Sequence, residues 1–273
     1  MKKSLIWTIA VILTLGTAVY QRLTGPTHPV SYKLNIADRV YKIHLPTSHG
    51  GSTDKIIMIQ DSLDQGFITY RRFPTSEPWD TVLMQNEQGY LTGYLPCQPP
   101  AGKLEYFVFI ISGTELLQVN DQPVIIRFKG DVPAYVLIPH ILIIFAAMMF
   151  STVTGFFAAF RYPSYKVLTW VTIILLVTGG LIFGPVIQKF AFGDFWTGFP
   201  FGKDLTDNKI LIAFILWLIA AIANINKQRS WLVVVAAIVY LFINLIPHSL
   251  FGSELDYESG QVVTGMIPFI HLF

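Results

Sequence analysis

Long apolar runs dominate the pattern of hydrophobic and polar positions in this chain. Four of them lie in the C-terminal half, at residues 136–160, 167–187, 210–225 and 231–246, and a fifth covers residues 5–20. A helix of about 20 apolar residues spans the hydrocarbon core of a bilayer. The runs therefore predict five membrane-spanning helices, of which the last two along the chain are short but contain no charged residue.

The first apolar run is compatible with either a retained signal anchor or a cleaved signal peptide. It follows Lys2 and Lys3 directly, as both a signal anchor and the apolar region of a cleaved signal peptide would. The small residues Gly16-Thr17-Ala18 at its end make a poor cleavage site. The pattern favours an anchor that stays in the protein as its first span.

A different pattern occupies the stretch between the first span and the other four. Short β-rich runs alternate there with turn residues such as Ser48-His49-Gly50-Gly51, Gln98-Pro99-Pro100 and Asn120-Asp121. The runs lie at residues 40–45, 55–60, 67–72, 90–95, 104–111 and 124–128. Several short strands at such spacing are typical of an all-β sandwich.

One of these strands carries a family resemblance. The segment 100–108, which begins Pro100-Ala-Gly and contains Tyr106, resembles the Pro/Gly-led strand of immunoglobulin-like and fibronectin-type domains, in which a tyrosine closes a corner. The resemblance implies an immunoglobulin-like sandwich. It covers a single strand and implies no ligand.

Together these patterns divide the chain into four parts. Residues 1–25 contain the first span, and residues 26–132 form a β domain inserted before the other spans. Residues 133–250 form a domain of four transmembrane helices with a long loop at residues 188–209, and residues 251–273 form a tail. The predicted fold class is therefore a helical membrane protein of five spans with an all-β insertion.

The charged residues predict how the spans are oriented. If the N-terminus is cytoplasmic, the inner segments contain six basic residues and no acidic one, whereas all 17 acidic residues fall outside. Short cytoplasmic loops collect Lys and Arg in this way. The six basic residues are Lys2, Lys3, Arg161, Lys166, Lys227 and Arg229. We therefore predict a protein of the inner (plasma) membrane whose β domain, loop 188–209 and tail are extracytoplasmic.

Composition excludes several classes of protein. Hydrophobic residues make up 53% of the chain and charged residues 13%, which excludes a purely soluble globule. A net charge of +2 without a basic stripe argues against a nucleic-acid partner. Because Cys97 is the single cysteine, an internal disulfide and a cysteine-based zinc site are excluded. No nucleotide cradle, nucleophile triad or paired carboxylate is recognisable, so we do not expect an enzyme.

Candidate site residues gather at the predicted outer face. His140 lies near the outer end of the second span and His248 just beyond the outer end of the last. Between them in sequence, the loop 190–209 is rich in aromatic residues and glycine and contains Trp196. Asp204, Thr206 and Asp207 at its end can orient a polar group or cap the next helix. Neutral imidazole binds iron well, so two histidines beside an aromatic platform could hold a haem from both axial sides.

This arrangement resembles the haem-handling membrane proteins of cytochrome c maturation. In that family, an outer loop rich in tryptophan joins two spans, and histidines at the outer ends of flanking spans ligate the haem. The resemblance implies that His140 and His248 are axial ligands and that Trp196 belongs to the platform. Asp204 and Thr206 would match the acidic end of the loop. The loop here holds one tryptophan, and the paired Trp-Asp signature of the family is missing.

A structural interpretation of the same residues stands beside this one. Pro-His pairs commonly end spans, phenylalanine-rich loops lie in the headgroup region, and Thr206 can simply cap a helix. A site for another small molecule or a lipid is a third alternative. In the β domain, Arg71 and Arg72 could bind an anion and His44 and His49 a metal. The sequence favours a solvated strand end and ordinary turn histidines instead, because no other His or carboxylate lies nearby at a ligand-like spacing.

Two functions remain open at this stage. The first is an accessory or assembly subunit of the cell envelope whose β domain docks a partner protein. The second is a haem-binding or haem-handling protein that uses the outer histidines.

Overall fold

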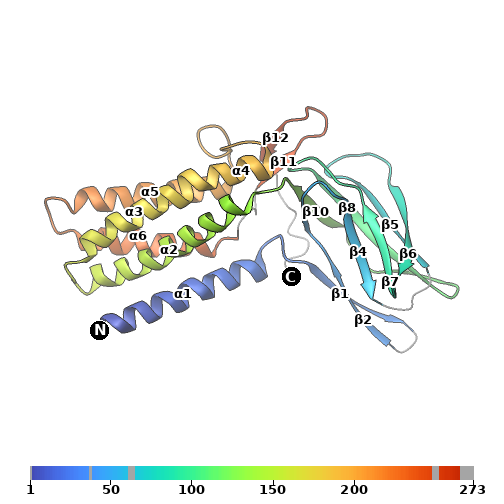
Figure 1. The fold of residues 1–273 in the computed structure, drawn as a ribbon, viewed down its shortest axis with the longest axis horizontal. Coiled ribbons are helices and arrows are strands. Elements are labelled where there is room, and N and C mark those ends of the chain that lie inside the picture. The colour runs from blue at the N-terminus through green and yellow to red at the C-terminus, as the bar shows by residue number, and fades with distance from the viewer. Residues whose placement is uncertain (1, 37–38, 61–64, 248–251, 265–273) are drawn as a thin grey trace. The chain divides into compact units, whose positions relative to one another are not determined.

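A computed structural model describes residues 2–36, 39–60, 65–247 and 252–264 of the chain. The residues divide into two compact units, one built from helices and the other from strands (Figure 1). The short segment Ala191–Gly193, at the end of a helix, belongs to the strand unit, and so does the C-terminal hairpin. Each unit is described separately below.

Among the residues that the structure describes, the helical unit contains an N-terminal helix and six further helical elements that follow the β domain in sequence. All five predicted apolar runs are helical. The elements are α1 (Lys3–Thr24), α2 (Ala134–Ala159), α3 (Tyr165–Leu176), the π-helical turn η1 (Val177–Phe183), α4 (Gly184–Phe192), α5 (Leu205–Ala223) and α6 (Ser230–Leu245).

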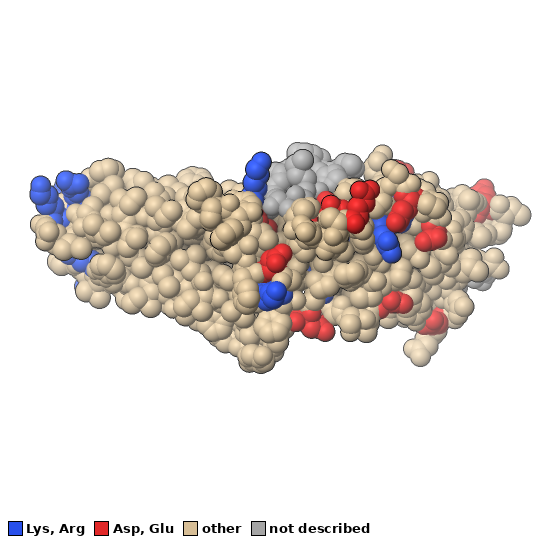
Figure 2. All heavy atoms as spheres, turned by 90° about the horizontal axis from the view of Figure 1, so that it is seen from above, with Lys and Arg blue, Asp and Glu red and all other residues tan. Residues whose placement is uncertain are grey.

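Four of these helical stretches are long and apolar enough to cross a membrane. They are α1, α2, the continuous stretch Tyr165–Phe192 and α5, while α6 is apolar but shorter, with 16 residues. On the face drawn in Figure 2, the helical unit is nearly free of charge along its length, and Lys and Arg gather at one of its ends. These features are compatible with a membrane protein.

Close approach between α2 and α6 depends on a glycine. A Cβ atom built on Gly155 of α2 would lie 2.5 Å from the Cβ atom of Ala237 on α6. Real Cβ atoms do not approach so closely, and small residues at such crossings let helices in membranes pack backbone to backbone. Ala237 belongs to the same buried core cluster as Trp217 of α5, which is fully buried.

This crossing predicts a selective effect of Gly155→Val. The added side chain must push α2 and α6 apart, and overpacking of this kind costs about 1–3 kcal/mol. We expect a lower thermal unfolding midpoint for the detergent-solubilised chain. The matched control is Gly16→Val in α1, because a Cβ at Gly16 meets no atom within 4 Å. Equal midpoints for the two variants would contradict the proposed close packing.

Within the described parts of the chain, the strand unit contains ten strands between α1 and α2 and two after α6. Its core lies between strands that are far apart in sequence, with Ile57 of β4, Val108 of β8 and Phe128 of β10 in one cluster. The strands are β1 (Val30–Ile36), β2 (Arg39–Leu45), β3 (Ser48–Gly50), β4 (Lys55–Gln60), β5 (Gln65–Arg72), β6 (Asp80–Glu87), β7 (Tyr90–Leu95), β8 (Lys103–Ser112), β9 (Glu115–Gln118), β10 (Val124–Lys129), β11 (Ser253–Leu255) and β12 (Val262–Thr264).

Eight of the strands join into one sheet that curls around this core. The order is β3-β10-β8-β5-β6-β7-β4 with β9 added on β8, while β1 and β2 form a separate hairpin. Strand β6 links the two halves, because its residues 80–84 pair with β5 and its residues 85–87 with β7. The arrangement is barrel-like. The predicted β-rich character is confirmed, and the immunoglobulin-like assignment stays a prediction.

Two local features of the strand unit bear on the sequence-based expectations. The predicted turn at Ser48 is instead the short strand β3, which pairs in parallel with β10. Backbone pairing overrides the turn-forming residues there, because the neighbouring strand offers free carbonyl and N–H groups. The buried Tyr106, the tyrosine of the resembling strand, donates its hydroxyl hydrogen bond to the carbonyl oxygen of Pro46 at 2.9 Å.

The C-terminal hairpin of β11 and β12 packs on the strand unit through buried charges. Lys103 of β8, which is 1% exposed, forms an ion pair with Glu254, and Arg127 of β10 donates to the carbonyl oxygen of Ser253. The hydroxyl group of Tyr257 accepts a hydrogen bond from the backbone N–H of Lys103 at 3.0 Å, and burial raises the pKa of Tyr257 to about 12. Polar side chains therefore hold this hairpin in place.

Candidate functional site

His140 has a defined tautomer in the helical unit. It lies half-buried in α2, and its Nδ1 is 2.9 Å from the carbonyl oxygen of Gly179. A carbonyl only accepts, so Nδ1 carries the hydrogen and the lone pair of the neutral ring resides on Nε2. Gly179 belongs to the π-helical turn η1, a kind of turn that is often found at functional sites. Metal-binding histidines are commonly oriented by such a second hydrogen bond.

The other predicted ligand, His248, lies outside the described residues. Within the described ranges, no three His, Cys, Asp or Glu side chains come together in a way that could hold a metal ion. A haem site remains a prediction for this pair of histidines.

The remaining predicted site residues lie in the loop that precedes α5. Asp204 is the N-cap of α5, and its Oδ1 accepts hydrogen bonds from the backbone N–H groups of Thr206 at 2.7 Å and Asp207 at 3.4 Å. Trp196 donates its indole N–H to the carbonyl oxygen of Phe199 at 3.0 Å. Asp204 and Thr206 thus have the helix-capping geometry that the structural interpretation of these residues described.

The polar residues that follow Thr206 stabilise this loop. The buried carboxylate of Asp207 accepts from the backbone N–H groups of Thr197 at 2.7 Å and Gly198 at 3.0 Å, and Asn208 Oδ1 accepts from Phe199 N–H at 2.7 Å. Asn208 was not among the site residues predicted from the sequence. The signal in the sequence is the polar run 206–209, which leads directly into the apolar part of α5. A polar side chain next to an apolar span needs a hydrogen-bond partner, so such a run indicates contacts of this kind.

The next residue, Lys209, connects this end of α5 to the end of α6. Its buried ammonium group donates to the carbonyl oxygens of Ile246 at 2.8 Å and Pro247 at 3.4 Å. A helix leaves its last carbonyl groups without intrahelical partners, and a lysine side chain is a suitable donor for them. The sequence analysis assigned Lys209 no role either.

Phenylalanine side chains of the loop remain exposed around this fixed backbone. Phe195, Phe199 and Phe201 all expose more than half of their surface, and Phe201 is 83% exposed. Because the hydrogen bonds of Asp207 and Asn208 hold the backbone, the rings are presented by an ordered loop. The loop can therefore contact a headgroup layer or a ligand.

The strand unit carries a second candidate, a sheet surface lined by aromatic rings. Phe67 of β5 pairs in register with Phe109 of β8, and the two rings stack with centroids 4.9 Å apart. The ring of Trp79 lies 5.3 Å from that of Phe107, two residues earlier on the same side of β8. Cross-strand aromatic pairs of this kind stabilise the sheet and also present a wide apolar surface.

The same surface continues onto the neighbouring strands. Leu83 of β6 lies opposite Phe67 in register and is 74% exposed. On β9, the exposed Leu116 lies opposite Ile111 of β8. Ile111 is on the same side of the sheet as Phe109. We call this surface the aromatic face and define it by six residues: Phe67, Trp79, Leu83, Phe107, Phe109 and Leu116.

The sequence contains a signal for the aromatic face in strand β8. Residues 106–111 of β8 are apolar at every position, whereas a strand with one solvated side alternates apolar and polar residues. The structure shows why, since Tyr106, Val108 and Ile110 point into the core and the alternate positions form the aromatic face. A continuous apolar strand indicates that both of its sides meet apolar neighbours.

An arginine borders the aromatic face. The Arg71 guanidinium lies 4.6 Å from the centre of the Trp79 ring, and its Nε donates to Glu105 at 2.5 Å. Its sequence neighbour Arg72 is 3.5 Å from Glu77 and stacks over Tyr257. Both arginines therefore have partners within the protein.

The two histidines of the β domain also have local partners. His44 Nδ1 is 2.8 Å from the hydroxyl oxygen of Ser31 on the paired strand. His49 donates from Nε2 to the carbonyl oxygen of Thr53 at 2.8 Å. Both contacts agree with the interpretation of these residues as ordinary histidines of strands and turns.

Comparison with known protein families, with curated proteins and with solved structures finds no match to this chain. What the protein does is therefore inferred from its own residues and geometry.

Proposed function

We propose that the chain is a membrane-anchored accessory or assembly subunit of the cell envelope, and that its β domain binds a partner protein through the aromatic face. In this proposal the N-terminus is cytoplasmic and the β domain extracytoplasmic, at the inner (plasma) membrane. The apolar helices support the membrane location. The six basic residues of the inner segments, which carry no acid, support the orientation.

The observation that carries the proposal is the apolar character of an exposed sheet surface. Trp79 stacks with Arg71 at its edge, and Leu83 on the same surface is 74% exposed. Tryptophan, aromatic side chains and arginine dominate the binding energy of protein interfaces. Contiguous exposed apolar surface on a folded domain marks such interfaces.

The proposed partner is a protein with a complementary apolar surface. The aromatic face supplies stacked rings, and the paired Arg71 and Glu105 at its border place polar groups at the rim. This apolar centre with a polar rim is the general organisation of protein interfaces. The test is site-specific photo-crosslinking from the aromatic face of the full chain in native membranes, combined with the Leu83→Asp variant described in the Discussion.

A second candidate function, haem binding, is favoured by the hydrogen bond of His140. Because Nδ1 donates to Gly179, Nε2 is the nitrogen that can bind iron. His140 and His248 would hold the haem iron, Trp196 would contribute to the aromatic platform, and Asp204 and Thr206 would shape the end of the loop. The bound haem would supply an iron centre for electron or haem transfer.

Haem binding predicts a visible spectrum that depends on the two histidines. Protein purified from haem-replete cells should show a Soret band, and the double variant His140→Ala, His248→Ala should lose or shift it. The control is His44→Ala, because the ring of His44 is bound to Ser31 within the β domain. A colourless wild-type protein would count against haem as the ligand, without affecting the proposed docking function.

A further inference from the structure

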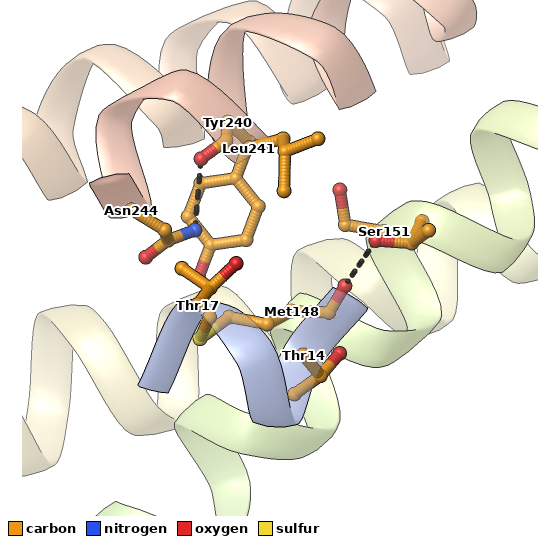
Figure 3. Close-up of a pocket in the computed structure, with 8 residues that line it drawn as sticks. Thr14, Thr17, Met148, Ser151, Tyr240, Leu241 and Asn244 are labelled. Carbon is orange, nitrogen blue, oxygen red and sulfur yellow. Dashed lines mark hydrogen bonds between the residues drawn. The ribbon is translucent and has the colours of Figure 1, made fainter. Parts of the chain in front are cut away.

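Three helices of the helical unit enclose a small polar pocket. Its walls come from α1, α2 and α6 and are drawn in Figure 3. The lining residues are Thr14, Thr17, Met148, Ser151, Thr152, Tyr240, Leu241 and Asn244. Hydroxyl groups are costly to bury between apolar helices unless they form hydrogen bonds. The pocket therefore requires an explanation beyond close packing.

Some of the polar groups around the pocket bond to the backbone of their own helix. Thr152 donates its hydroxyl hydrogen bond to the Met148 carbonyl at 3.1 Å, and Asn244 donates its amide to the Tyr240 carbonyl at 2.8 Å (Figure 3). At one end of the pocket, Gln21 of α1 donates to the carbonyl oxygen of Asn244. These bonds fix α6 and the C-terminal part of α1 around the pocket.

Thr14 is the exception. The residue is 7% exposed, and among the residues that the structure describes its Oγ1 has no hydrogen-bond partner. The hydroxyl groups of Ser151 and Tyr240, both buried, line the same pocket from the other two helices. A buried hydroxyl without a partner costs about 1–3 kcal/mol. A small molecule with hydrogen-bonding capacity on several sides would remove that cost.

The size of the pocket limits which molecule can occupy it. Its volume is about 10 Å³, measured as the space open to the centre of a water molecule. That value is close to the minimum that holds one water, and it is too small for a lipid chain or a ring. A buried water needs two to four polar partners, and the hydroxyl groups of Thr14, Thr17, Ser151 and Tyr240 lie on the walls.

We propose that one ordered water molecule occupies this pocket and bridges α1 to α2 and α6. It donates to and accepts from hydroxyl groups on all three helices, so it satisfies Thr14 and fixes α1 in the bundle. The α1 helix is then an integral part of the helical unit. Its buried positions Ile6, Ala10, Thr14 and Thr17 follow the spacing of one helix face, as this role requires.

The test removes single hydroxyl groups from the full chain in detergent. Thr14→Val keeps the shape of the side chain, and we expect the unfolding midpoint to fall by about 2–4 °C. The matched control is Thr8→Val on the same helix, whose hydroxyl is exposed and donates to the Ser4 carbonyl at 3.1 Å. Equal midpoints for these two variants would overturn the proposal, because Thr14 would then be satisfied within its own helix.

A second measurement distinguishes a shared water from separate hydrogen bonds. If Thr14 and Ser151 bind the same water, the double variant Thr14→Val, Ser151→Ala should lose clearly less than the sum of the two single losses. Additive losses would contradict a shared water. An experimental density map should also contain a peak within hydrogen-bonding distance of Thr14 Oγ1, and an apolar or featureless pocket there would contradict the proposal.

Discussion

Glu254→Gln should destabilise the strand unit by about 3–5 kcal/mol, the usual cost of leaving one partner of a buried ion pair uncompensated. Lys103 is 1% exposed, and its ammonium group is held by the Glu254 carboxylate. Without that charge the lysine is a buried cation, and the C-terminal hairpin loses its main polar contact. Hydrogen exchange of peptides from β8, measured by mass spectrometry on the full chain, should show the loss of protection.

The chain offers a matched control for this effect. Glu77 forms an ion pair with Arg72 at 3.5 Å, and both side chains are about half exposed. Exposed pairs contribute about 0–1 kcal/mol, so Glu77→Gln should leave the protection of β8 nearly unchanged. Similar losses in the two variants would show that Lys103 does not depend on Glu254. Replacing both members of the buried pair, as Lys103→Met with Glu254→Leu, should recover most of the loss.

The same ion pair predicts a dependence on pH. Burial lowers the pKa of Lys103 below its ordinary value of 10.5, although Glu254 partly offsets this shift. Between the lowered pKa and 10.5, the unfolded chain binds more protons at this site than the folded chain does. The contribution of Lys103 to the free energy of unfolding is therefore least favourable below the lowered pKa. It improves as the pH rises from the lowered pKa to 10.5. Hydrogen exchange at several pH values, corrected for its intrinsic rate, measures this trend.

The second large effect is expected at the aromatic face. Leu83→Asp places a charge in the middle of an apolar interface, where it has no partner, and we expect the dissociation constant of the docked protein to rise at least about 100-fold. The fold should be unaffected because the Leu83 side chain is 74% exposed. A photoreactive phenylalanine derivative at position 83 of the full chain should form a discrete crosslinked product in native membranes.

The control for this experiment is on another part of the β domain. Val40 is 63% exposed and lies on β2, outside the aromatic face. Val40→Asp should leave binding of the same partner unchanged, and the photoreactive group at position 40 should not capture it. Equal crosslinking from positions 40 and 83, or equal binding by the two Asp variants, would rule out the aromatic face as the docking surface.

Local patterns were sufficient to predict most of the elements. The five apolar runs became helices because their signal lies within about 20 consecutive residues. The six β-rich runs became strands for the same reason. Strands β1, β3, β6, β9, β11 and β12 were not predicted. β6 and β9 contain few apolar residues and form because neighbouring strands pair with them. β1 alternates apolar and polar residues, a strand signal that the prediction missed.

The site was less predictable, and particular residues show why. Asp204 was recognised as a possible helix cap from its position before an apolar run, which is a local signal. The hydrogen bond between His140 and Gly179 joins residues 39 positions apart, and nothing local in the sequence records it. The contact of Glu254 with Lys103 joins residues 151 positions apart. Such contacts depend on how the elements pack together.

The sequence by itself determined the class of the elements, the division into a helical and a β-rich part, and the grouping of basic residues on the predicted inner segments. These properties depend on periodicity and composition over short stretches. Only the tertiary structure decided which side of β8 faces the core and that the other side forms the aromatic face, and that Thr14, Ser151 and Tyr240 line one pocket. Both depend on register and helix rotation, which arise when distant segments pack.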